Sequence, residues 1–256
     1  MSVFSSCHSM DFSMNSPYDL GNVYEGPFRI YYVNIVDSDK CVPVADDESL
    51  EKIDPTSLVG LKACMFWNGI NGDFSKYENL KCLIIVARPI VGRLVVSNSL
   101  EFLSITYSNS GIEGDIDLSG CAAMEHLRIE REVKGKLILP TVSLKSLSVG
   151  DFLSRIREIT TPLQCKMLTQ MSIYLGGIPE DMPIPEWIAA LEIRGGRAEI
   201  VDLSKLYQLK YLLILTEDIT LLILPSHIVE NYEYRINAYK AHEKIKIVGN
   251  QKIEYY

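Results

Sequence analysis

The sequence predicts a mainly β protein that folds as a right-handed solenoid of stacked coils, with short extended or 3-10 return segments and few helices. Three observations support this prediction. An apolar hexad recurs along most of the chain, a weaker apolar alternation follows most of the hexads, and prolines fall between them. A chain of 256 residues, 47% of them hydrophobic, can bury the shared core that such a stack needs.

The hexad has an apolar residue, two variable residues, a second apolar residue, one variable residue and an apolar β-former. Seven strong copies start at Leu80, Leu100, Met124, Leu144, Leu168, Ile188 and Leu209, and weaker copies are expected to start at Leu61, Val229 and Asn250. The starts from 80 to 229 are 20 to 24 residues apart, which is typical of solenoid repeats. Since one coil cannot bury its own apolar face, the coils are expected to stack.

The return segments carry a second pattern. Apolar residues alternate at period two after most hexads, which favours strands over helices. The segments are Gly92-x-Leu94-x-Val96, Gly114-x-Ile116-x-Leu118, Gly135-x-Leu137-x-Leu139, Val201-x-Leu203, Leu222-x-Leu224 and Ile245-x-Ile247. Prolines such as Pro140, Pro162 and Pro185 also disfavour long return helices. Each coil is therefore predicted to hold one well-formed strand and one short extended return.

The first 60 residues differ from the rest. Residues 1–20 are polar and small and are predicted to be a mobile N-terminal segment. Residues 21–60 are predicted to be an N-terminal cap, with a strand over Phe28–Val36 and an acidic loop or short helix over Cys41–Asp54. Residues 61–256 are predicted to be the solenoid with its C-terminal capping coil. Caps are expected because an open sheet edge invites association.

The L-x-x-L-x-I/V hexads, such as Leu100-x-x-Leu103-x-Ile105, resemble those of the leucine-rich repeat superfamily over roughly residues 61–255. Two features depart from that pattern. The Asn or Cys that usually follows the hexad is mostly missing, and the repeats are short and poor in helix formers. The resemblance therefore implies an irregular, short-repeat type, similar to repeats of bacterial effectors and surface proteins.

Composition narrows the class of protein. The formal net charge of −8 argues against a sequence-independent nucleic-acid binder and against a polybasic membrane-surface protein. No apolar run is long enough for a membrane span. The six cysteines form no C-x-x-C pair, so we expect reduced thiols and a cytoplasmic, reducing location. Export as an effector by a route without a cleavable signal stays open.

Outward positions of the strands define a candidate binding surface, because side chains alternate along a strand. Large, aromatic and charged residues at these positions are the types that dominate protein interfaces. The predicted partner-binding residues are Phe102, His126, Arg128, Tyr174, Glu192, Arg194 and Tyr211. The competing interpretation is that these residues only fill a pleated surface and pair with their neighbours.

No catalytic motif has a suitable context. The chain lacks a phosphate-binding loop, a nucleophile elbow and an H-E-x-x-H helix, so no catalytic residue, metal site or cofactor is predicted. His126, Arg128 and Glu130 are interpreted as a surface ion cluster, and Glu192 with Arg194 as a solvated pair. We expect a non-enzymatic scaffold, with a monomer favoured, that binds another protein. The alternatives are a carbohydrate- or surface-binding module and a secreted effector-like adaptor of a microbe.

Overall fold

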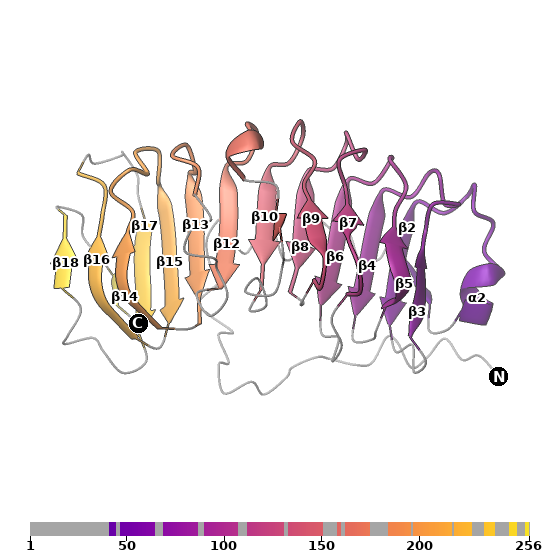
Figure 1. Ribbon diagram of the computed structural model, residues 1–256, viewed down its shortest axis with the longest axis horizontal. Helices are drawn as coiled ribbons and strands as arrows, with labels where there is room; N and C mark the ends of the chain where they lie inside the picture. The colour runs from indigo at the N-terminus through magenta and orange to yellow at the C-terminus, as the bar shows by residue number, and fades with distance from the viewer. Residues whose placement is uncertain are drawn as a thin grey trace.

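A computed structural model describes residues 41–44, 47–64, 69–86, 90–106, 112–130, 133–150, 158–159, 162–174, 184–195, 197–216, 218–226, 233–238, 246–249 and 254–255. The chain forms a parallel β-solenoid whose coils stack along the longest axis of the molecule (Figure 1). The mainly β solenoid predicted from the hexads is therefore confirmed. The strand predicted over Phe28–Val36 and the N-terminal segment 1–20 lie outside the described residues.

One parallel sheet runs the length of the stack, and each of its eleven described strands pairs only with its neighbours in the chain of coils. In order the strands are β1 (Val42–Val44), β2 (Gly60–Cys64), β4 (Cys82–Val86), β6 (Phe102–Thr106), β8 (His126–Ile129), β10 (Ser146–Val149), β12 (Gln170–Tyr174), β13 (Ala190–Arg194), β15 (Tyr211–Thr216), β17 (Glu233–Ala238) and β19 (Glu254–Tyr255). The outward side of this sheet is called the strand face below.

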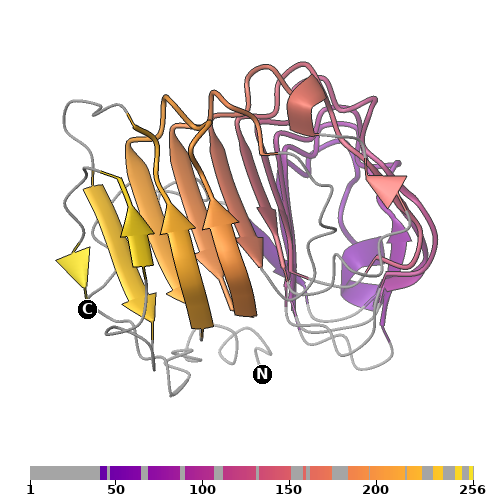
Figure 2. The same ribbon diagram turned by 60° about the vertical axis from the view of Figure 1, so that its left-hand side comes forward.

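The returns form three smaller parallel sheets on the other side of the coils, and their strands run in the opposite direction (Figure 2). They pair β3 (Ile70–Asp73) with β5 (Ile90–Val95), then β7 (Ile116–Asp117), β9 (Lys136–Ile138) and β11 (Glu158–Ile159), then β14 (Arg197–Asp202), β16 (Asp218–Ile223) and β18 (Lys246–Val248). The predicted extended returns are thus confirmed. Within the described residues the helices are α2 (Asp47–Glu51) and the 3-10 turn η4 (Pro162–Gln164), and none could cross a bilayer.

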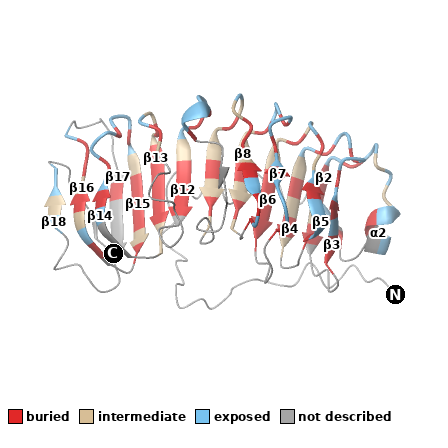
Figure 3. Cartoon of the chain, viewed as in Figure 1, coloured by how far each residue is buried: buried red, intermediate tan, exposed pale blue. Residues whose placement is uncertain are grey.

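The register stacks like residues of successive hexads. Leu103 pairs with Leu127, and Leu127 pairs with Leu147. These leucines are buried in one core cluster that extends from Val44 to Tyr234. Figure 3 shows the long sheet mostly buried or half-buried, with exposed residues gathered at the turns and on return strands. The core is therefore a continuous row of stacked leucines and isoleucines, as the hexads predict.

Turns before several core strands share one local motif. Asp73 Oδ1 accepts hydrogen bonds from the backbone N–H and the hydroxyl of Ser75, at 3.0 and 2.6 Å. Asp117 makes the same two contacts with Ser119. These hydrogen bonds lower the pKa of each carboxyl, because they favour its charged form. The motif fixes the corner that leads each chain segment into the next core strand.

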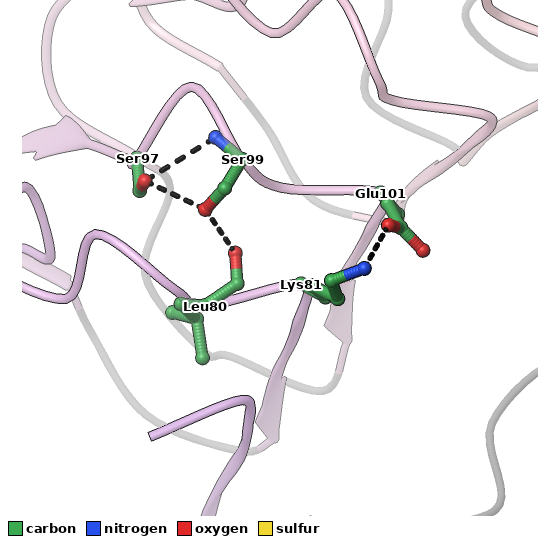
Figure 4. Close-up of polar contacts among 5 residues, drawn as sticks. All are labelled: Leu80, Lys81, Ser97, Ser99 and Glu101. Carbon is green, nitrogen blue, oxygen red and sulfur yellow. Dashed lines mark hydrogen bonds and ion pairs between the residues drawn. The ribbon is translucent and has the colours of Figure 1, made fainter. Parts of the chain in front are cut away.

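Side chains also bond successive coils just before the core strands. The Ser99 hydroxyl donates to the Leu80 carbonyl at 2.9 Å, and Lys81 pairs with Glu101 at 2.8 Å (Figure 4). Two coils further along the stack, the Ser143 hydroxyl donates to the Met124 carbonyl at 2.7 Å. Serines placed just before the hexads thus bond the carbonyl groups of the preceding coil.

Two assignments from the sequence need correction, and a third is confirmed only in part. The first coil begins at Leu58, not Leu61, because Leu61 pairs with Leu83 and is itself the second apolar position. The penultimate hexad is displaced by two residues, since Tyr234 pairs with Leu212 and is buried. Within the acidic Cys41–Asp54 segment, the structure places β1 as well as the short helix α2. Val44 and Leu50 pack into the core there, so this segment is more than a solvated loop.

Candidate functional site

The predicted anchors fall into two groups on the strand face. Phe102, His126 and Arg128 lie on β6 and β8, and the rings of Phe102 and His126 lie 6.4 Å apart, tilted by 48°. Tyr174, Glu192, Arg194 and Tyr211 lie on β12, β13 and β15. The side chain of Tyr174 lies outside the described part of the structure. The two groups are separated by β10, whose outward residues Ser146 and Ser148 are small, as is Gly150, which follows the strand.

His126 lies half-buried at the start of β8. Burial lowers the pKa of its imidazole, while Glu125 opposes that shift and Lys145 adds to it. Its Nε2 lies 3.8 Å from a carboxylate oxygen of Glu125, and Glu125 also pairs with Lys145 at 2.7 Å. His126 therefore belongs to a chain of polar contacts across β8 and β10.

Arg128 forms an ion pair with Glu130 on the same strand edge. The guanidinium Nε and Nη2 both donate to Glu130 Oε1, with Nε at 2.8 Å. Both side chains are about one quarter exposed. The surface ion cluster predicted there consists of this pair, with His126 turned toward Glu125 instead.

Glu192 and Arg194 form a second pair on β13. Arg194 Nε lies 2.8 Å from Glu192 Oε1, and the exposed fraction is 25% for Arg194 and 0% for Glu192. The interpretation of this pair as solvated is therefore wrong, because its carboxylate is completely buried. Neither carboxylate oxygen of Glu192 accepts a hydrogen bond of good geometry. Among the described residues, the ion pair with Arg194 is the interaction that compensates for the burial of this charge. Because Glu192 is buried and Arg194 is partly exposed, Glu192 can affect the strand face only through its ion pair with Arg194.

A pocket of about 220 Å³ opens between these two ion pairs. Its lining residues come from β10, β12 and the strand edges on either side, and they are Glu130, Ser148, Val149, Gly150, Ser172, Ile173 and Arg194. Strand register places Arg128, Ser148, Ser172 and Glu192 in one row across the sheet. The charged residues stand at the ends of the row and the serines between them, so the small side chains leave the hollow.

Gly150 lies close against the backbone of Glu130 at the edge of this hollow. A Cβ added to Gly150 would lie 2.7 Å from the Cα of Glu130. No side chain can therefore be added there without moving the neighbouring strand. Sequence reasoning had not selected Gly150, Ser148 or Ser172, although a run of small outward residues between two charged positions is a readable signal for a hollow.

Cysteines of the described residues are poor candidates for nucleophiles. Cys41 Sγ donates to Cys82 Sγ at 3.4 Å, and the contact with Cys41 together with burial raises the pKa of Cys82. Burial also raises the pKa of Cys121 to about 11. Because the thiolate is the reactive form, these thiols are unreactive near neutral pH. Among the described residues no cluster of three or more His, Cys, Asp or Glu side chains could hold a metal ion.

A scan against known protein families, a search of curated proteins and a search of solved structures each found no match to this chain. The strand face is therefore interpreted from its own residues. Among the described residues it offers two half-buried arginines, two half-buried aromatic rings and a pocket lined by charged and small residues on a parallel sheet.

Proposed function

We propose that this chain is a non-enzymatic interaction module that binds another protein through the strand face of its solenoid. The observation that supports the proposal best is the pocket between Glu130 and Arg194, because it lies amid the anchor residues. A small number of arginine and aromatic side chains near the centre of an interface supply most of its binding energy, and they pack into pockets from which the surrounding contacts exclude water. A flat and evenly charged face would have offered no such centre.

The long parallel sheet also supports the proposal, because it restricts the conformations of the anchor side chains. Phe102, Arg128 and Tyr211 lie on strands that are hydrogen-bonded on both sides, and each is half-buried. A side chain already restricted by its neighbours loses less freedom when a partner binds. Binding groups built on strands are also placed more accurately than groups on loops.

Alanine variants of two aromatic anchors test the proposal. Phe102→Ala and Tyr211→Ala should abolish recovery of a partner that is identified by mass spectrometry from the native cell. Tyr207→Ala is the matched control, because Tyr207 is half exposed at a turn outside the strand face. Arg194 is unsuited to this test, since its loss would leave Glu192 buried without its counter-charge. Equal recovery with Phe102→Ala, Tyr211→Ala and Tyr207→Ala would contradict binding by the strand face.

We also propose that the coils are irregular leucine-rich repeats. The leucine hexads support this assignment, and so does the single strand that each contributes to a continuous parallel sheet. An experimental structure whose coils superpose on leucine-rich repeats only in the strand and not in the following turn would contradict it.

A cytoplasmic, reducing location is proposed as well. It is supported by the thiols of Cys82, Cys121 and Cys165, which form no disulfide in the described part of the structure. Alkylation of thiols in intact cells, followed by mass spectrometry of the purified protein, measures their state. Cysteines found oxidised before lysis would contradict this location.

A further inference from the structure

We propose that the pocket between Glu130 and Arg194 binds a neutral sugar ring. This inference rests on the strand face being the binding face, but it does not require the partner to be a protein. Three features of the pocket support the inference: the charge balance around it, the hydrogen-bonding groups that line it and its volume.

The charge balance disfavours an ionic ligand. Glu130 is already paired with Arg128, and Arg194 with Glu192, so the residues around the pocket carry no net charge. The two ion pairs also have opposite orientations on the sheet. The row of residues that contains the positive Arg128 contains the negative Glu192 of the other pair. An ion entering the pocket would lose its hydration and meet no net opposite charge. A neutral polar ligand avoids that loss.

The lining groups match a ligand that both donates and accepts. Glu130 supplies carboxylate acceptors and Arg194 supplies guanidinium donors. The hydroxyls of Ser148 and Ser172 can each donate and accept. Neighbouring hydroxyls of a sugar ring have this same dual character. A site built to bond hydroxyl groups discriminates strongly against ligands that lack them, because its own polar groups are then left unpaired.

The buried carboxylate of Glu192 supplies an independent observation. It is completely buried, has no well-formed hydrogen bond, and lies 2.8 Å from Arg194 Nε. Burying a charge in this way is costly and is seldom retained for stability alone. Its effect here is to orient the Arg194 guanidinium beside the pocket before a ligand arrives.

Size and shape limit the ligand to one ring. The pocket volume of about 220 Å³ is smaller than the range of roughly 300–1,000 Å³ usual for larger ligands. Val149 and Ile173 point their side chains into the core, so their backbone contributes the floor beneath Ser148 and Ser172. Gly150 also lines the pocket, where it lies close against the backbone of Glu130.

Ligand-detected NMR with the full chain tests the inference. The probes are a panel of neutral hexoses, pentoses and N-acetylhexosamines, with free serine, free arginine and inorganic phosphate as charged comparisons. At least one neutral sugar should bind in the millimolar range, with the same affinity at low and high salt. The double variant Ser148→Ala with Ser172→Ala should weaken that binding by about tenfold, since each lost hydrogen bond costs a few-fold. Ser146→Ala, on the same strand but outside the pocket lining, should leave it unchanged.

Several results would overturn the inference. One is that no neutral sugar of the panel binds, and another is that phosphate or an amino acid binds more tightly and in a salt-dependent manner. Equal sugar binding by the double serine variant and by Ser146→Ala, with circular dichroism melts showing both to be folded, would also overturn it. Partner recovery is measured separately with Phe102→Ala and Tyr211→Ala, so failure of the sugar assay leaves the protein-binding proposal to its own test.

Discussion

Replacing Arg194 by methionine is predicted to destabilise the folded chain by about 3 kcal/mol. The reason is the Glu192 carboxylate, which is 0% exposed and has Arg194 Nε 2.8 Å from its Oε1. An exposed ion pair contributes less than about 1 kcal/mol, whereas removing one partner of a buried pair costs about 3–5 kcal/mol. The lower end of that range applies because Arg194 is itself 25% exposed, so water can approach the vacated site.

A double-mutant cycle measures this effect. The free energy of unfolding is obtained from urea titrations followed by circular dichroism and by fluorescence, with Arg194→Met, Glu192→Leu and the double variant compared with the parent chain. The double variant should lie within about 1–2 kcal/mol of the parent, because an apolar pair can replace a buried ion pair at little cost. Leu213, buried beside Glu192 in the same row, provides apolar surroundings for the new leucine. A loss below about 1 kcal/mol for Arg194→Met would refute the reasoning, since the pair would then behave as an exposed one.

Three further predictions follow from the turns, the histidine and the core. Hydrogen bonds from Ser75 and Ser119 lower the pKa of Asp73 and Asp117 in the folded chain. The two carboxylates should therefore stabilise the folded chain at any pH above the ordinary carboxyl pKa of about 3.9, and this stabilisation should be lost as the pH falls through their lowered pKa values. Melting temperatures measured from neutral to acidic pH check this prediction. It would be contradicted if the Ser119→Ala variant and the parent chain lost stability at the same pH. Because burial lowers the pKa of His126, NMR titration should place it below about 6.5, and stability should decrease as pH falls through that value. Lys145→Ala should raise the His126 pKa, and a lowered or unchanged value would contradict the assigned causes. Leu147→Ala should lower the free energy of unfolding by about 2–5 kcal/mol, and Val142→Ala, at an exposed turn, by less than about 0.5 kcal/mol; similar losses for the two would contradict the assignment of the core row.

The stacking of the coils was predictable because it depends on a repeated pattern. Leu103, Leu127 and Leu147 occupy equivalent hexad positions, and each is buried against the next. The errors occurred where the pattern is weakest. The coil that starts at Leu58 places Ala63 at its last apolar position, so a competing frame starting at Leu61 had a similar apolar content.

The candidate site was harder to predict than the fold. Sequence alone selected the charged and aromatic outward residues, and the register then placed Arg128 and Glu192 in one row. It did not show that Glu192 is completely buried, because alternation along β13 describes only which side of the sheet a residue faces. The pocket depends on residues of four neighbouring coils, and Ser148, Gly150 and Ser172 become informative only when the coils are aligned.

The strict neighbour pairing of the long sheet has a consequence for how the chain folds. Each strand pairs only with those of the coils before and after it, so the pairing contacts link residues about one coil apart in sequence. The entropy of closing each such loop is the same at every step, however many coils have already formed. Folding can therefore begin at one pair of coils and propagate in both directions along the stack. Its rate should depend on the pair of coils that forms most readily and not on the total number of coils.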